Sequence, residues 1–315
     1  MGSNFLKILL AAAIIIFVVG SVKTFAFEPS SPSLSLPARA TDNSARITDA
    51  LGNPSSRASQ TGQAHKIIWH DTIQSDPNEW GLHLGCEHPI NGVKITCDAE
   101  NGANLSRVPD PAGGSGWAIR HSIIPSHGGG RAQLSTSTLG NPAFATQLAN
   151  YGEVWIEQEM FIPAPIPSSE GNGPWISLMD FHSSNANGAG RWHTNPGLFL
   201  CSEALRCPPS ETGKLVARDW KNKMFGGPSA KSVPINQWFR LQVHFRWSTS
   251  PVPVTYYVNG TQVLQITLPT KDSGHTVLEW YSKLYGGGKW TPNPLVRYTR
   301  NVRFSDSFIH EPINQ

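Results

Sequence analysis

Charged residues are scarce in this chain, and neither sign dominates. Asp, Glu, Lys and Arg make up 15% of the 315 residues, and the formal net charge is +3. Beyond residue 65 the chain holds 20 of the 25 basic and 19 of the 22 acidic residues. A nucleic-acid-binding domain generally needs concentrated positive charge. The composition therefore argues against a nucleic-acid partner.

Long helical patterns and internal repeats are also absent from the sequence. Glycine (29 residues) and proline (25 residues) are frequent, as they are in proteins built from short strands and turns. This balance disfavours helical bundles and favours one large all-β domain. One short helix is predicted for residues 141–152, "NPAFATQLANYG".

The N-terminal apolar run is too short for a typical membrane helix, which needs roughly 20 apolar residues. It covers residues 8–20, with Lys7 before it, Lys23 after it and the small residue Ala26 shortly beyond. This layout predicts a signal peptide over residues 1–26, with an uncleaved anchor as the alternative. Residues 27–65 are rich in Ser and Pro and are expected to form a disordered linker. We therefore expect a folded domain over 66–315 that is secreted, extracellular or periplasmic and has no membrane contact after cleavage.

The chain has only four cysteines, and their spacing does not resemble a zinc knuckle. In an oxidising compartment cysteines pair, and four of them allow three connectivities. The pairing Cys86–Cys97 with Cys201–Cys207 closes the shortest loops. We predict these two disulfides.

From residue 66 onward, apolar and polar residues alternate with the period of two that marks β-strands. In "EVWIEQEMFIP" an apolar set faces the core and consists of Val154, Ile156, Met160 and Ile162. The opposite face then carries Trp155, Glu157 and Glu159. Carboxylates beside an aromatic ring form an unusual solvent face, which makes this strand a candidate part of a binding site.

Two further strands place titratable side chains opposite a core set. In "WISLMDFHSSN" (175–185), Met179 and Phe181 are assigned to the core, so Asp180 and His182 share the outer face with Ile176 and Leu178. Residues i and i+2 of a strand are roughly 6.5–7 Å apart, close enough to contact one ligand.

In "EWYSKLYGGGKW" the outer residues are Tyr281, Lys283 and Tyr285. We expect Glu157, His182 and Lys283 to enter one groove from neighbouring strands.

The strand "QWFRLQVHFRWS" and the hairpin "YYVNG" that follows give an order of elements which resembles the concanavalin A-like jelly rolls. This fold is a sandwich of two antiparallel β-sheets. Within this superfamily the chain is most similar to the jelly-roll polysaccharide lyases of the alginate, glucuronan and heparin lyase type. Those lyases carry three motifs on one sheet: an Arg/Glu-bearing strand, a Gln-x-His strand, and a Tyr-x-Lys strand followed by a second Tyr.

His182, Tyr281 and Lys283 match these motifs in the same order along the chain. Three departures are visible. Asp180 stands where the lyases have Gln, and Tyr285 lies two residues nearer than the usual second Tyr. Glu157 and Glu159 match the first motif without its Arg.

The resemblance implies a metal-free β-elimination on a uronic-acid-containing glycan. His182 would be the base, Tyr285 or Tyr281 would donate or accept a proton, and Lys283 would neutralise the substrate carboxylate. The expected substrate-binding residues are Glu157, Glu159, Trp155 and Asp180. No cofactor is required, and a monomer acting on a polysaccharide is expected.

Two other functions remain open from the sequence. A lectin-like domain of the laminin-G type would bind glycans with the same residues and without cleavage. A laminarinase-type hydrolase would need two carboxyl groups about 5–5.5 Å apart, such as Glu157 with Glu159 or with Asp180. Oxygen-rich segments at 98–102 and 305–306 are candidates for structural calcium.

Overall fold

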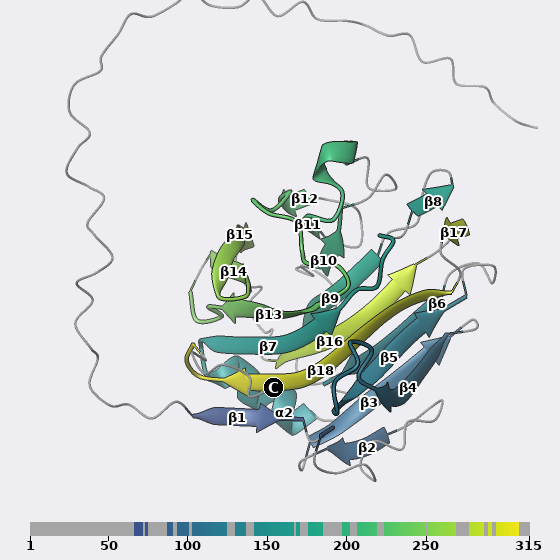
Figure 1. Cartoon of the computed structure of the whole chain (residues 1–315). Coiled ribbons are helices and arrows are strands. Elements are labelled where there is room, and N and C mark those ends of the chain that lie inside the picture. The colour runs from purple at the N-terminus through teal and green to yellow at the C-terminus, as the bar shows by residue number, and fades with distance from the viewer. Residues whose placement is uncertain are drawn as a thin grey trace, which may run out of the picture. The chain divides into compact units, whose positions relative to one another are not determined.

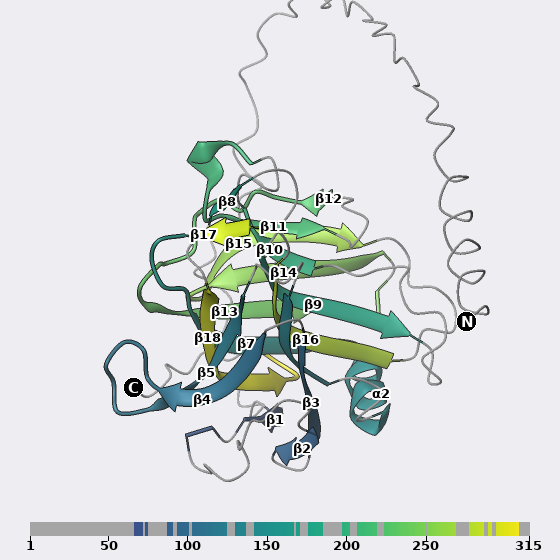
Figure 2. The ribbon, with the colours of Figure 1, turned by 90° about the vertical axis from the view of Figure 1, so that its right-hand side faces the viewer.

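Two antiparallel β-sheets pack face to face in this computed structural model (Figures 1 and 2). The structure describes residues 66–71, 73–74, 87–90, 93–100, 103–124, 130–136, 142–166, 168–170, 176–184, 197–201, 207–218, 224–249, 251–268, 277–286, 289–291 and 294–308. All of them belong to one unit, Thr61–Gln315. The predicted signal peptide and linker lie outside the described residues. The all-β sandwich predicted from the sequence is confirmed.

The first sheet, which we call sheet A, has the strand order β15-β14-β13-β7-β18-β5-β4, and β1 also pairs with β18. Its strands are β1 (Ile67–His70), β4 (Asn104–Pro109), β5 (Trp117–Ile123), β7 (Val154–Phe161), β13 (Trp238–Phe245), β14 (Val252–Val258), β15 (Thr261–Leu268) and β18 (Leu295–Ser305).

The second sheet, sheet B, has the order β12-β11-β10-β9-β16-β6-β3-β2. Its strands are β2 (Glu87–Ile90), β3 (Val93–Glu100), β6 (Gly130–Ser135), β9 (Ile176–Ser184), β10 (Gly197–Leu200), β11 (Leu215–Arg218), β12 (Met224–Gly226) and β16 (Val277–Gly286). A small additional sheet pairs β8 (Ser168–Glu170) with β17 (Lys289–Thr291), and a 3-10 turn, η4, covers Pro209–Glu211.

The interior of the sandwich is built from the alternate apolar residues of both sheets. Val154 and Met160 of β7 are buried in it, and Trp280 and Leu284 reach it from β16. The hairpin between β14 and β15 is also as predicted, because Asn259 and its following glycine adopt the positive φ angles (50° and 76°) that a tight two-residue turn needs. Alternation therefore correctly identified the core face of these strands.

Strand β9 departs from strict alternation because it contains a β-bulge. Its pairing with β10 shifts between Met179 and Ser177, so Leu178 and Met179 both lie in the core. The sequence had predicted Ile176 and Leu178 on the outer face with Asp180 and His182, whereas both lie in the core. The bulge corrects that assignment and leaves the expected outer position of Asp180 and His182 intact.

Helix α2 (Pro142–Asn150) confirms the short helix predicted before β7. Its buried residues Phe144 and Leu148 join the core. No helix in the described part of the chain has the length and apolar character needed to cross a bilayer.

One of the two predicted disulfides is confirmed. Cys201 and Cys207 are bonded, with their Cα atoms 5.8 Å apart, and they close a short loop after β10. The other prediction, Cys86–Cys97, involves Cys86, which lies outside the described residues.

A buried carboxylate joins the first strand of the domain to the last. Asp71 Oδ2 accepts a hydrogen bond from the backbone N–H of Val302 at 2.6 Å, and Oδ1 accepts one from Ile73 at 3.4 Å. Burial raises the pKa of Asp71 to about 6, and the two backbone hydrogen bonds offset only part of this rise. Ionised Asp71 therefore costs stability near neutral pH.

We expect Asp71→Asn to stabilise the protein at pH 7 relative to the wild type and to leave it unimproved near pH 4. The folded chain holds the Asp71 proton more tightly than the unfolded chain does, so wild-type stability falls as pH rises from about 4 to about 6. The free energy of unfolding of the wild type falls by about 3 kcal/mol over this range. The Asn variant has no ionisable group at this position and does not lose this stability. Urea unfolding of both proteins at the two pH values measures it. Parallel pH dependences in the two proteins would contradict this role.

Candidate functional site

The outer face of sheet B collects most of the side chains that the sequence singled out. Strands β9 and β16 are antiparallel neighbours, with Tyr281 opposite Asp180 and Glu279 opposite His182. Residues that face each other in such a register point to the same side of the sheet. The core residues of both strands point the other way, so these four side chains share one patch.

An ion pair links the two strands. Lys283 Nζ lies 2.5 Å from Asp180 Oδ2, and the Ser177 hydroxyl donates a hydrogen bond to Asp180 Oδ1 at 3.2 Å. Burial alone would raise the pKa of Asp180, but the charges of Lys283 and His182 and these two hydrogen bonds hold it below its usual value. Asp180 is therefore an anion neutralised by Lys283. An ionised Asp without such a partner would repel a substrate carboxylate.

His182, Tyr281 and Glu279 form a second cluster beside that ion pair. The rings of His182 and Tyr281 lie 4.1 Å apart between centroids. The Tyr281 hydroxyl donates a hydrogen bond to Glu279 Oε2 at 2.8 Å, and His182 Nδ1 is 3.9 Å from the same oxygen. Glu279 is fully buried. The Glu279 carboxylate thus lies next to both candidate proton-transfer groups, His182 and Tyr281.

Sequence reasoning missed Glu279, although the signal was present. In "EWYSKLY" it stands two residues before Tyr281, in the same alternate set as Tyr281, Lys283 and Tyr285. Tyr285 is half-buried, and Lys283 Nζ lies 5.3 Å from its ring centroid, within range of a cation–π contact.

Strand β6 supplies polar residues that the sequence reading also missed. Arg131 pairs in register with Tyr285, Gln133 with Lys283, and Ser135 with Tyr281. The intervening Ala132 and Leu134 lie in the core, so the residues of β6 alternate between the core face and the outer face of sheet B. Arg131, Gln133 and Ser135 therefore face the same side of sheet B as Tyr281, Lys283 and Tyr285.

The expectation that Glu157, Glu159 and Trp155 share this groove is wrong. They belong to β7, which pairs with β13 and β18 in sheet A. Their side chains point outward from sheet A, on the side of the sandwich opposite to the His182 patch. Alternation predicts which residues of a strand share a face, but it does not predict the sheet that the strand joins.

On sheet A the two glutamates are bound by basic side chains. Glu157 forms an ion pair with Arg303, accepts a hydrogen bond from Gln242 Nε2 at 2.8 Å and lies 3.7 Å from Arg240 Nε. Burial raises the pKa of Glu157 despite these partners. One of the two carboxyl pairs considered for a hydrolase, Glu157 with Asp180, is excluded because β7 and β9 belong to different sheets.

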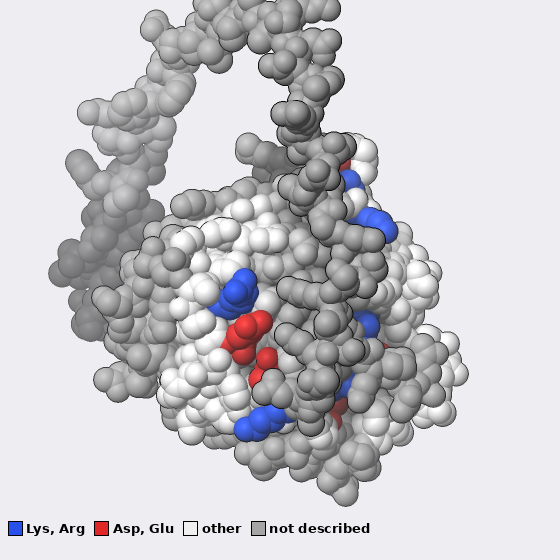
Figure 3. Space-filling model, turned by 90° about the vertical axis from the view of Figure 1, so that its left-hand side faces the viewer, with Lys and Arg blue, Asp and Glu red and all other residues white. Residues whose placement is uncertain are grey.

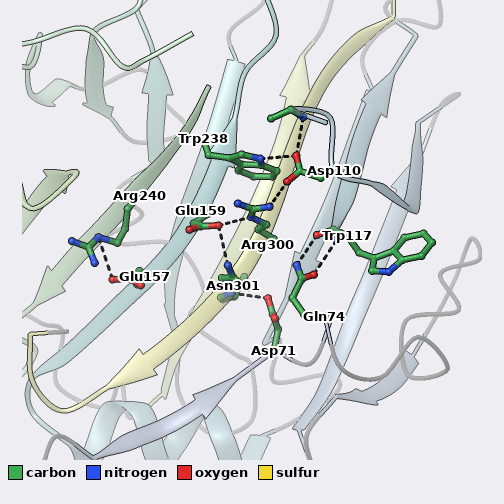
Figure 4. A network of polar contacts seen from close by, with 12 residues as sticks. Asp71, Gln74, Asp110, Trp117, Glu157, Glu159, Trp238, Arg240, Arg300 and Asn301 are labelled. Carbon is green, nitrogen blue, oxygen red and sulfur yellow. Dashed lines mark hydrogen bonds and ion pairs between the residues drawn. The ribbon is translucent and has the colours of Figure 1, made fainter. Parts of the chain in front are cut away.

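Glu159 belongs to the same outer face (Figure 4). Arg300 of β18 bridges Glu159 and Asp110, with its Nη1 2.5 Å from Asp110 Oδ2. Trp238 packs against the guanidinium of Arg300 at 4.1 Å and donates a hydrogen bond to Asp110 Oδ1 at 2.8 Å. Asn301 donates another to Glu159. These contacts give Glu159 a structural role, in which it binds Arg300 and Asn301.

Trp155 is also occupied by protein contacts. Its ring stacks on His244 with centroids 3.9 Å apart and an interplanar angle of 7°, and Tyr257 and Phe308 pack around it. The substrate-binding role expected for Trp155 would therefore have at most one ring face available.

Metal ligands are not gathered anywhere in the described part of the chain: no group of three or more His, Cys, Asp or Glu side chains there has the arrangement of a metal site. Of the two candidate calcium segments, residues 98–102 fall largely outside the described side chains. Asp306 is exposed and accepts hydrogen bonds from Lys66 N and the Ser307 hydroxyl. Figure 3 shows one side of the molecule, where the few visible charged side chains are of both signs.

No protein-family model and no curated protein sequence matches the chain. Several solved structures, in contrast, are similar to this chain. The endo-β-1,4-glucuronan lyase from the fungus Trichoderma reesei superposes with a TM-score of 0.50 at 12% identity, over 77% of this chain and 97% of that one.

Two other similar structures have lower scores. The alginate lyase vAL-1 from Chlorella virus gives 0.45 at 10% identity, over 76% and 99% of the two chains. The carbohydrate esterase vb_24B_21 from bacteriophage phi24B gives 0.44 at 10%, over 77% and 99%. The superposition shows that this chain and the glucuronan lyase share a two-sheet jelly-roll fold.

Proposed function

We propose that the chain is a polysaccharide lyase that cleaves a uronic-acid-containing glycan by β-elimination on the outer face of sheet B. The observation that carries this proposal is the joint placement of His182, Tyr281 and Lys283 on one face of two adjacent strands. The reaction removes the proton at C5 of the uronate, forms the C4–C5 double bond, breaks the C4–O bond and protonates the departing oxygen.

His182 is the base in this scheme, because histidine side chains titrate close to neutral pH. Glu279, 3.9 Å behind Nδ1, favours the imidazolium that forms when His182 takes the C5 proton. In this scheme Nε2 is the nitrogen that receives the proton. Glu279 thereby acts on the reaction through His182, without contacting the sugar.

The acid is better assigned to Tyr285 than to Tyr281. Tyr281 is buried and its hydroxyl is bonded to Glu279, whereas Tyr285 is only half-buried. Lys283 lies near the ring of Tyr285, where a cation lowers the cost of a transient phenolate. Tyr281 then positions His182 by packing against its ring.

Lys283 and its neighbours would neutralise the substrate carboxylate and so acidify the C5 proton. One ammonium donor of Lys283 is used by Asp180, and an ammonium group has three. Gln133 and Arg131 of β6 lie across from Lys283 and Tyr285 and add amide and guanidinium donors to the same face. Asp180 in this scheme orients Lys283.

Glycan binding without cleavage is the second candidate. The polar side chains of the patch already bind one another: Lys283 pairs with Asp180, and Tyr281 donates a hydrogen bond to Glu279. Such internal pairing holds side chains rigid, which suits a surface that recognises a glycan without cleaving it. Both candidates fit an exported protein. The disulfide Cys201–Cys207 supports export, because such bonds persist in oxidising compartments.

The deciding assay incubates the protein with alginate, glucuronan, heparin and pectate and follows the ultraviolet absorbance of the unsaturated uronate product. We expect absorbance to rise with at least one polymer. His182→Ala should lower the rate by about 100-fold or more, the usual contribution of a general base. His244→Ala is the matched control, because His244 lies on the outer face of sheet A. Glycan binding with no rise in absorbance would establish the second candidate instead.

Glu279→Gln tests the proton-transfer cluster. The amide oxygen can still accept the Tyr281 hydrogen bond, but the negative charge beside His182 is gone. A histidine without that charge binds its proton less tightly, so the acidic limb of the pH–rate profile should move to lower pH by about one unit. The activity near pH 7 should also fall, because the imidazolium formed in the reaction loses its support. Superimposable profiles for the two proteins would show that Glu279 has only a structural role.

A further inference from the structure

An arginine side chain lies inside the sandwich, between the two sheets. Arg297 of β18 is 1% exposed and pairs in register with His121 of β5, whose side chain is also buried. The Arg297 Nη2 donates a hydrogen bond to the Ser282 hydroxyl of β16 at 3.1 Å. Arg297 therefore bridges the interiors of sheets A and B.

Two donor nitrogens of this guanidinium have no acceptor among the described residues. Arg297 Nε and Nη1 are buried and form no hydrogen bond with the described residues, and no described carboxylate pairs with Arg297. Burial lowers the pKa of Arg297 to about 9, so the group is still charged at neutral pH. A buried charge without a counter-charge is strongly unfavourable.

His121 does not supply the missing negative charge. Burial lowers the pKa of His121 well below its usual value, and the charge of Arg297 lowers it further. His121 is therefore neutral. Its Nδ1 donates to the Ala132 carbonyl at 3.1 Å, and Nε2 accepts from the Thr299 hydroxyl at 2.9 Å. Both ring nitrogens are used.

A small cavity lies beside Arg297. Its volume is about 10 Å³, and it is lined by Arg297 and seven aliphatic residues, among them Leu178, Leu284 and Leu295. A volume of this order holds one water-sized particle. A water molecule there would find donors on Arg297 but few acceptors for its own hydrogens, because the other lining side chains are aliphatic. A spherical anion needs donors only, and it also neutralises the charge.

We propose that Arg297 binds one monovalent anion of about chloride size in this cavity. Ser282, the hydrogen-bond partner of Arg297, lies between Tyr281 and Lys283 on β16 and points to the opposite face. The anion therefore stabilises β16, the strand that carries the candidate site, from its core side. The anion site does not depend on the proposed lyase function.

Thermal unfolding in sodium chloride and in sodium gluconate at equal ionic strength tests the site. Gluconate is too large for the cavity and screens surface charge equally. For the wild type, 0.3 M chloride should raise Tm above the gluconate value by about 3 °C or more. Arg297→Met, which removes the cation and keeps an apolar side chain of similar length, should show equal Tm in both salts. Equal Tm values in the wild type, or the same chloride effect in both proteins, would overturn the proposal.

Crystals of the wild type grown in sodium bromide give a second test that does not depend on the variant folding. Bromide is slightly larger than chloride and scatters anomalously near its absorption edge. We expect one anomalous peak in the cavity, within contact of the Arg297 Nε and Nη1 atoms. Density for a water molecule there, with no anomalous signal, would show that the core guanidinium is hydrated and that no anion site exists.

Discussion

The pairing of β9 with β16, whose register is continuous from Val277 to Ser282, is the constraint on which the candidate site depends. That register places Asp180 opposite Tyr281 and His182 opposite Glu279, and the Lys283–Asp180 ion pair connects the same two strands. Because side chains alternate along a strand, a slip by one residue would turn every one of these groups into the core. The apolar residues between them, such as Phe181 and Trp280, prevent that slip, since they would become exposed to water.

The two outer faces of the sandwich use ionisable groups differently. On sheet A each glutamate of β7 is held by arginines of β18 or β13, and the acidic and basic groups balance within the network. On sheet B a lysine, a histidine and two tyrosines accompany two carboxylates, so proton donors and acceptors of different strength lie side by side. The first arrangement suits stability, and the second suits proton transfer.

The sequence predicted the hairpin at Asn259 and the outer position of His182 from turn chemistry and local alternation, and it predicted the sandwich from its resemblance to the jelly rolls. It misassigned β7, since nothing local distinguishes a strand of sheet A from one of sheet B. Glu279 was missed although it alternates with Tyr281 and Lys283 in the same segment. Arg131 and Gln133 of β6 were missed because their importance comes from strand neighbours far away in the chain. The bulge at Leu178 was likewise invisible, as it depends on the pairing with β10.

We expect the outer face of β6, β16 and β9 to bind a uronate chain. A crystal structure of His182→Ala with a uronate tetrasaccharide, taken from a polymer that the protein binds, tests this most directly. The account predicts a sugar carboxylate within hydrogen-bonding distance of Lys283 Nζ and a ring beside residue 182. Electron density for the sugar over β7 and β13 of sheet A, with the sheet B face bare, would contradict it.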